Sequence, residues 1–237
     1  MPLPKLVTPE FTLKVPSTKE PVKIRPFLVK EEKVLFMALE GADAAEIEDA
    51  IINVLESCVL TPGIDINKLP SYDVEYLFLQ LRGKSVGENI TLRMSHGDDI
   101  ECKHITEVDV NVEEIEVYFD KNHKHKVQIS DEIGIKFKDP TLKDLTSINP
   151  VDNNNYDTIV SVVTNCIDVV YDNDNVYDNF NKEEAADFLN SMTQEQFMKV
   201  QGFFNTLPKL QKTVEWTCPE CGQKDSVTIE GLQNFFL

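Results

Sequence analysis

The sequence has 237 residues, with 41 acidic and 23 basic side chains, and therefore a formal net charge of −18. This charge disfavours nonspecific nucleic-acid binding and docking on an anionic membrane, because both partners attract basic surfaces. Hydrophobic residues make up 41% and charged residues 27%, which is typical of a folded chain of one large or two small domains.

Neither the first residues nor any later stretch suggests a membrane. Residues 1–5 lack the apolar run of a secretion signal. No apolar stretch approaches the ~20 residues that span a bilayer. We therefore expect a protein made in a cytoplasm without a membrane anchor. The five cysteines are an odd number, which disfavours a disulfide framework.

The first half of the chain predicts a hairpin, three helices and a second extended region. Residues 11–15 and 22–24 alternate between apolar and polar side chains around prolines, which is typical of a β-hairpin. Apolar residues then recur every three or four positions, which predicts helices over 30–41, 47–59 and 70–81. Strands are predicted at 91–94 and 105–112, joined through a polar turn at 96–99.

The second half repeats the mixture of strands and helices. The predicted strands are 115–119, 126–129, 133–137, 213–217 and 226–229. The predicted helices are a short one from 140 to 148, a strongly apolar one over 159–170, one over 185–192 and one from Thr193 to Phe204. Thr193 and Gln196 have the spacing of a capping box, and a polar loop is expected over 172–181.

These elements indicate an α+β protein with β-hairpins and helical clusters in two lobes, which a duplication would explain. Residues 22–28 have a counterpart in 135–142. Two β-branched residues follow Cys102 and Cys221 at the same spacing. We expect an N-terminal lobe over 1–115, with a hairpin, three helices and a Cys/His β segment. A C-terminal lobe over 116–237 would contain a hairpin, helices and a Cys-x2-Cys knuckle.

The knuckle is the clearest chemical motif. Cys218 and Cys221 are separated by two residues and followed by Gly222, between two predicted strands. This pattern is typical of a zinc-ribbon β-hairpin, in which a tight turn presents two thiolates to one ion.

One Cys-x2-Cys supplies two of the four ligands that structural zinc requires. Cys102 together with His104 would complete a Cys3His site, and His96 is the alternative histidine. One structural zinc is therefore one interpretation, and a knuckle without metal is the other. A redox pair is disfavoured because no thioredoxin-like βαβ pattern surrounds it.

The sequence contains no motif typical of an enzyme. It has no nucleophile motif, no phosphate-binding glycine loop and no dinucleotide fingerprint. His123 and His125 lie on one side of a predicted strand end, where a solvated turn is favoured over metal binding. No catalytic residues and no small-molecule substrate are expected.

Three segments carry a resemblance to a known family. They are residues 15–18 with 24–33, residues 72–88 (Tyr-Asp-Val-Glu-Tyr-Leu-Phe-Leu-Gln-Leu-Arg-Gly-Lys-Ser-Val-Gly-Glu), and the ending with Cys218-Pro-Glu-Cys-Gly, Glu230-Gly-Leu and Phe235-Phe236. The chain resembles the baseplate hub and hub-assembly proteins of T-even-like, contractile-tailed bacteriophages. The likeness covers most of the chain and is weakest around 120–180. The family favours a middle cysteine pair, where this sequence has His96 and Cys102-Lys103-His104.

The resemblance implies a non-enzymatic structural or assembly role in the tail baseplate hub. Its partners would be other baseplate or hub proteins, and the protein would be made in the host bacterial cytoplasm and located in the virion. Two alternatives are an assembly chaperone absent from the mature virion and a zinc-ribbon adaptor in transcription or replication.

Two surfaces are candidates for binding these partners. Arg82 and Lys84 follow a predicted helix end, where they either contact a partner or serve as ordinary helix-terminal cations. Phe235 and Phe236 lie at the C-terminus, and large apolar residues there must dock on the chain's own core or in a neighbouring subunit.

Overall fold

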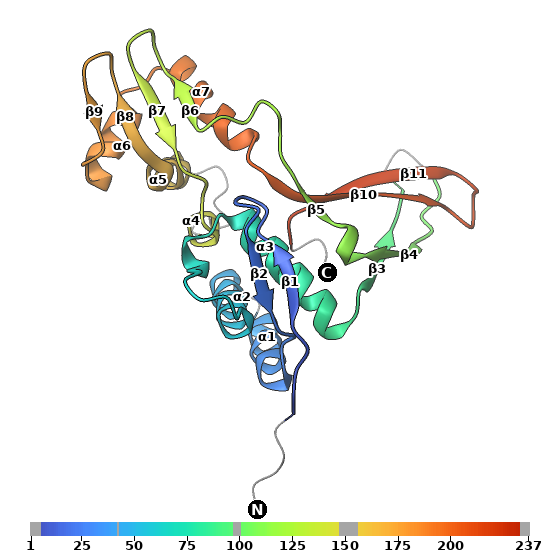
Figure 1. Cartoon of the computed structure of the whole chain (residues 1–237). Helices are drawn as coiled ribbons and strands as arrows, with labels where there is room; N and C mark the ends of the chain where they lie inside the picture. The colour runs from blue at the N-terminus through green and yellow to red at the C-terminus, as the bar shows by residue number, and fades with distance from the viewer. Residues whose placement is uncertain (1–5, 42, 97–100, 147–155, 233–237) are drawn as a thin grey trace, which may run out of the picture.

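The computed structural model describes residues 6–41, 43–96, 101–146 and 156–232, and it shows an α+β fold with small antiparallel sheets (Figure 1). Strands pair in the orders β1-β2, β3-β4, β11-β10-β5 and β6-β7-β8-β9. The predicted fold class is confirmed at this level. Among the described residues, no helix combines the length and apolar content that crossing a bilayer requires.

The N-terminal region contains the hairpin and the three helices that the sequence predicts. The elements are β1 (Phe11–Lys14), β2 (Pro21–Ile24), α1 (Val29–Gly41), α2 (Ala44–Cys58), the short 3-10 helix η1 (Ile66–Lys68) and α3 (Ser71–Val86). Asp43 begins α2 by accepting hydrogen bonds from the backbone N–H groups of Ala45 and Glu46, which satisfies donors that a helix start leaves unpaired.

Two further hairpins lie beside this region in Figure 1. The first consists of β3 (Asn89–Met94) and β4 (Thr106–Asn111), which is followed by η2 (Val112–Glu114) and β5 (Glu116–Tyr118). The second consists of β10 (Lys209–Thr217) and β11 (Lys224–Glu230), which pair from Gln211 opposite Glu230 to Thr217 opposite Lys224. The strand β10 also pairs with β5, so the end of the chain returns to its first half.

The remaining residues form a small sheet with helices beside it. The strands are β6 (Lys126–Gln128), β7 (Gly134–Phe137), β8 (Ile167–Tyr171) and β9 (Val176–Tyr177). The helices are α4 (Leu142–Thr146), α5 (Tyr156–Cys166), α6 (Lys182–Asn190) and α7 (Gln194–Asn205). The capping box of Thr193 and Gln196 at the start of α7 is confirmed.

Two elements differ from their predictions. The strand β9 lies within the polar loop expected over 172–181 and pairs with β8. The expected helix over 159–170 ends at Cys166, and residues 167–171 form β8 instead. Ile167, Val169 and Val170 are β-branched, and such side chains suit a pleated sheet better than a helix. They pair with β7, so long-range pairing outweighs the local helical period.

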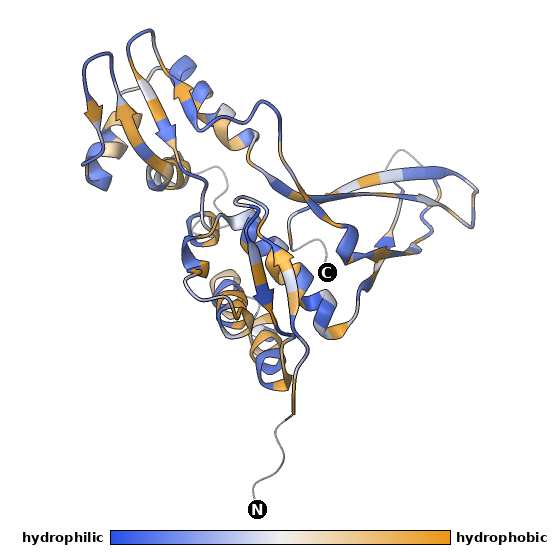
Figure 2. Ribbon diagram, in the orientation of Figure 1, coloured by the Kyte–Doolittle hydropathy of each residue, from blue (hydrophilic) through white to orange (hydrophobic). Residues whose placement is uncertain are grey.

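The buried apolar residues form two clusters. The first includes Leu77, Ile115 and Leu210, so it joins the N-terminal helices to β10. The second includes Phe137, Leu189 and Phe203 and lies within residues 127–207. Figure 2 shows hydrophobic residues on the elements of both clusters and hydrophilic residues along the connection from β5 to β6. The lobe boundary between 115 and 116 stays a prediction.

Polar contacts fix the first hairpin against α3. Asp73 is fully buried, and its carboxylate accepts hydrogen bonds from the backbone N–H of Ser17, at 3.0 Å, and from the Ser17 hydroxyl. A buried carboxylate is costly unless such donors satisfy it. Two of the segments that carry the family resemblance, around Ser17 and Asp73, therefore contact each other in the fold.

Candidate metal centre

Four potential metal ligands meet at the ends of two hairpins. His96 and Cys102 lie in the connection between β3 and β4, and Cys218 and Cys221 lie in the turn between β10 and β11. One ligand atom from each of the four lies within 4.8 Å of the others. The fold therefore brings together residues more than 100 positions apart in the sequence.

The turn between β10 and β11 places its two thiols through backbone hydrogen bonds. The N–H of Cys218 donates to the carbonyl of Gln223 at 2.9 Å, and the N–H of Gly222 donates to the carbonyl of Cys218 at 2.9 Å. Gly222 has a φ of +72°, a left-handed conformation that favours glycine. Cys218, Cys221 and Gly222 together therefore form a tight knuckle with both sulfurs on one side.

Backbone donors in the knuckle favour a thiolate at Cys218. The N–H of Cys221 is the main group that lowers the Cys218 pKa, to about 6, and the His96 side chain adds to it. At Cys221 the N–H of Gln223 lowers the pKa, but burial and the neighbouring thiols outweigh it, so the pKa is raised. Thiolates are the form that binds metal.

The other two cysteines lie in a different environment. Cys58 and Cys166 are fully buried in apolar clusters. Burial raises the pKa of Cys58 to about 11 and that of Cys166 to about 12. Both thiols therefore stay protonated at neutral pH, as buried structural cysteines do.

His96 has the hydrogen bonding of a metal ligand. Its side chain is only 1% exposed, and its Nδ1 lies 2.9 Å from Oδ2 of Asp225. Because a carboxylate can only accept, Nδ1 carries the proton and Nε2 is left for a metal. That Nε2 lies 3.4 Å from the sulfur of Cys221. The Asp225 contact raises the pKa of His96, and His96 lowers that of Asp225.

Two of the separations match those around a tetrahedral zinc ion. Zn–S bonds of about 2.3 Å at tetrahedral angles place two sulfurs roughly 3.8 Å apart, and a sulfur and a nitrogen roughly 3.6 Å apart. The sulfurs of Cys102 and Cys218 are 3.9 Å apart, and the Cys221 sulfur is 3.4 Å from the His96 nitrogen.

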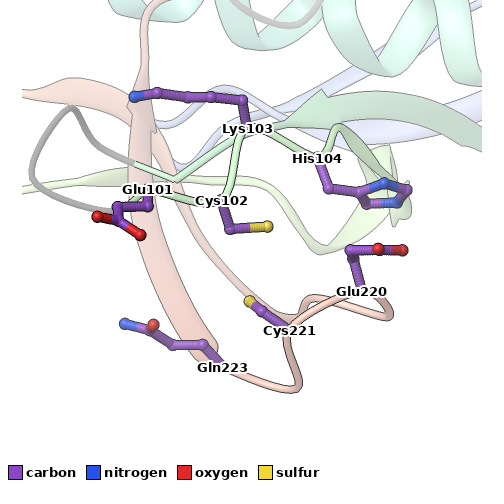
Figure 3. Close-up of a pocket in the computed structure, with 7 residues that line it drawn as sticks. All are labelled: Glu101, Cys102, Lys103, His104, Glu220, Cys221 and Gln223. Atoms are coloured by element: carbon purple, nitrogen blue, oxygen red, sulfur yellow. The ribbon is translucent and has the colours of Figure 1, made fainter.

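His104, the first choice from the sequence, lies outside this group of ligand atoms. Its side chain is exposed and lines an open depression at the edge of the site together with Cys102 and Cys221. In Figure 3 the sulfurs of Cys102 and Cys221 point toward each other, while the His104 ring lies beside Glu220. The structure therefore brings His96, the alternative histidine, to the three cysteines.

Sequence reasoning missed the role of Asp225. The residue could not be identified from the sequence, because its contact with His96 spans 129 positions. The available signal was its place at the start of β11, four residues after Cys221. A carboxylate there can support a ligand presented by a neighbouring hairpin.

The residues expected to bind partners are placed differently. Lys84 has a side chain 18% exposed and forms ion pairs with Glu88, at 3.2 Å, and with Glu113. Arg82 is partly buried, and this burial lowers its pKa. Phe235 and Phe236 lie outside the described residues. Their partner-binding role stays a prediction.

Comparison with known proteins identifies relatives over nearly the whole chain. The family described as T4 bacteriophage base plate protein matches residues 8–237. The baseplate hub assembly protein gp26 of Enterobacteria phage T4 is 24% identical over 217 residues, which cover 91% of this chain and 92% of that protein. No solved structure gives a significant match.

Proposed function

The chain belongs to the T4 bacteriophage base plate protein family, and from this premise we propose that it is a non-enzymatic structural or assembly component of a phage tail baseplate hub. The observation that carries the proposal is the extent of the match, which runs over residues 8–237. The similarity to a hub assembly protein also spans nine-tenths of both chains. The role therefore concerns the whole fold rather than one domain.

The absence of enzyme motifs from the sequence supports a role in binding rather than catalysis. The four clustered ligands His96, Cys102, Cys218 and Cys221 would close a tetrahedral site, and closed sites are structural rather than catalytic. The net charge of −18 disfavours the zinc-ribbon adaptor that would bind nucleic acid. We propose other baseplate or hub proteins as partners, with synthesis in the host cytoplasm.

Purification of the tagged protein from infected cells tests this role. We expect other baseplate or hub proteins to be recovered with the tagged chain and to remain bound through a salt wash. An unrelated acidic protein carrying the same tag should not recover them. Recovery of RNA polymerase or replication proteins instead would contradict the proposal. Mass spectrometry of purified virions then distinguishes a retained hub component from an assembly chaperone, which is absent from the particle.

We propose one structural zinc in the site, held by the thiolates of Cys102, Cys218 and Cys221 and by His96 Nε2. The support is the convergence of the ligand atoms within 4.8 Å and the lowered pKa of Cys218. The bound ion would fasten the β3–β4 hairpin to the β10–β11 hairpin. Two hairpins that each supply two ligands form the arrangement of a zinc ribbon.

Cobalt substitution tests the ligand set, because cobalt bound to thiolates has a characteristic charge-transfer absorption. The wild-type chain and His104→Gln are expected to show it equally, with His104 as the matched control. His96→Gln is expected to change the ligand-field spectrum and weaken binding, and Cys218→Ser to weaken the thiolate band. Equal spectra for His96→Gln and the wild type, with a loss in His104→Gln, would reverse the assignment.

We further propose that the two halves of the chain arose by duplication. In each half a hairpin strand, β2 or β7, is followed by a proline and a helix. In each half a later hairpin presents cysteine at its end, Cys102 in the first half and Cys218 and Cys221 in the second, and these two hairpins meet at the candidate site. Recovery of this repeat in an alignment of distant relatives would support the duplication. Relatives that consist of one half alone and still fold would also be expected.

Partner binding by the chain ends is tested separately. Deleting 233–237 is expected to leave the fold intact and abolish recovery of partners if Phe235 and Phe236 dock in a neighbouring subunit. An insoluble product would assign them to the chain's own core. Arg82→Gln and Lys84→Gln each test whether the end of α3 contributes to partner binding.

A further inference from the structure

A second group of metal-ligating side chains lies where the two hydrophobic clusters join. His123 and His125 lie in the connection from β5 to β6, and Asp139 lies between β7 and α4. One ligand atom of each residue lies within 4.8 Å of the other two. The Asp139 Oδ1 atom is 3.1 Å from His125 Nε2 and 3.4 Å from His123 Nε2.

The interpretation of these histidines as parts of a solvated turn is wrong for His123. Its side chain is only 9% exposed, and its ring centroid lies 4.9 Å from that of Phe203 on α7. His125 is 49% exposed and packs edge-on against the His123 ring, with centroids 5.1 Å apart. One imidazole is therefore buried, and its neighbour connects the group to solvent.

Thr206 is placed to accept a hydrogen bond from Nδ1 of His123. The Thr206 hydroxyl lies 3.1 Å from His123 Nδ1 and donates its own proton to the α7 carbonyls of Gly202 and Phe203, at 3.1 and 3.0 Å. With its proton directed to a carbonyl, the hydroxyl oxygen can accept from Nδ1–H, and in that tautomer Nε2 has a lone pair. That Nε2 is buried and makes no hydrogen bond.

The lone pair of His123 Nε2 then faces Oδ1 of Asp139, and both atoms are hydrogen-bond acceptors. Two acceptors repel unless a cation or a proton lies between them. His125 Nε2–H donates to the same oxygen at 3.1 Å, so binding of an ion would displace that proton, and three ligand atoms would then converge on one point. Two imidazoles and one carboxylate are a ligand set that divalent ions such as zinc and iron use.

The separations fit a bound ion. Bonds of about 2.0–2.1 Å at tetrahedral angles place neighbouring N and O ligands roughly 3.3–3.4 Å apart, and the two measured contacts to Asp139 are 3.1 and 3.4 Å. Supporting hydrogen bonds are also in place. The Tyr72 hydroxyl donates to Asp139 Oδ2 at 2.8 Å, which orients the carboxylate as outer groups do around metal ligands.

We propose that His123, His125 and Asp139 form a second divalent-metal site, of the zinc type, with a fourth position open to water. The ion would join segments that connect the two clusters (Figure 1). Residues 119–126 lead from the first cluster to the second, and residues 138–141 lead back to α4, while Thr206 precedes the return to β10. Metal binding would therefore fix the second cluster relative to the first.

Metal content of tag-free protein tests this site, since a polyhistidine tag would itself bind zinc. We expect a zinc titration of the wild type to give one equivalent beyond the thiolate-bound metal. His123→Gln/His125→Gln should lose that equivalent and keep the cobalt–thiolate band, which shows that the fold and the cysteine site are intact. His104→Gln, the remaining histidine outside both groups, is the control and should bind as the wild type does.

Single variants keep the test decisive if the double variant does not fold. His125 is half exposed, so His125→Gln should fold. Its affinity for the second zinc should be at least about tenfold lower. Asp139→Asn should do the same while keeping an acceptor for Tyr72. Equal zinc stoichiometry and affinity in the wild type and in both single variants would overturn the proposal. So would a wild type whose zinc is all bound by thiolates, which would leave a proton between His123 and Asp139.

Discussion

Replacing Asp225 by Ala removes the hydrogen-bond acceptor that orients His96 and leaves the proposed ligands in place. His96 Nδ1 lies 2.9 Å from Asp225, and the His96 side chain is 1% exposed, so water has little access to replace the lost acceptor. The ring can then rotate, or its proton can move to Nε2, and either change removes the lone pair from the metal.

The expected loss in zinc affinity is about 10- to 100-fold, the range found for such supporting residues. This corresponds to about 1.4–2.7 kcal/mol of binding free energy. Asp225→Asn keeps an acceptor without the charge, so its loss should be smaller than that of Asp225→Ala. Glu220→Gln is the matched control, because it removes an exposed carboxylate from the same knuckle.

Titration with zinc against a competing chelator measures these affinities. The cobalt–thiolate band serves as the readout, since it excludes metal bound to the other histidines. Equal affinities for Asp225→Ala and Glu220→Gln would refute the reasoning that His96 is a ligand held by Asp225. A loss confined to Glu220→Gln would refute it as well, because His104 lies beside that residue.

Three further predictions concern stability, measured by urea unfolding. Burial raises the pKa of Glu75 from 4.5 to about 7, so the folded chain holds a proton that the unfolded chain releases, and stability falls as pH rises from 4.5 through 7. Glu75→Gln should remove that fall, of about 3 kcal/mol at most, and an unchanged pH profile would contradict it. Glu31→Gln should lower the free energy of unfolding by about 3 kcal/mol. The Arg25 side chain, which lies 2.9 Å from Glu31 and is 15% exposed, would lose its buried partner. Lys30→Gln, which removes a 74% exposed partner of the same carboxylate, should cost under about 1 kcal/mol, and equal costs would count against the argument. Leu210→Ala should cost about 2–5 kcal/mol because the side chain is fully buried between β10 and the N-terminal helices; a cost below about 1 kcal/mol would show that β10 does not belong to that cluster.

Local patterns predicted most elements because their causes are local. The capping box of Thr193 and the apolar face of α2 depend on residues three or four positions apart. The end of α5 was missed because β8 is stabilised by pairing with β7, about 30 residues earlier in the chain. A helical period cannot reveal such a partner.

The candidate site was predictable in its chemistry and less so in its geometry. Cys218, Cys221 and Cys102 could be identified because thiols have few other uses in this pattern. The choice between His96 and His104 depended on how the β3–β4 connection folds against β11, which the sequence spacing does not determine. Burial of His123 likewise depends on α7, which packs against it from about 80 residues away.

Infection with a phage whose gene for this chain carries a stop codon tests the central claim most directly. Baseplates and tails in the lysate are then examined by sedimentation and electron microscopy, with the wild-type protein supplied from a plasmid as the control. A role in the baseplate hub predicts that complete baseplates are absent without the protein and restored by the plasmid. Normal tails in its absence would contradict the account.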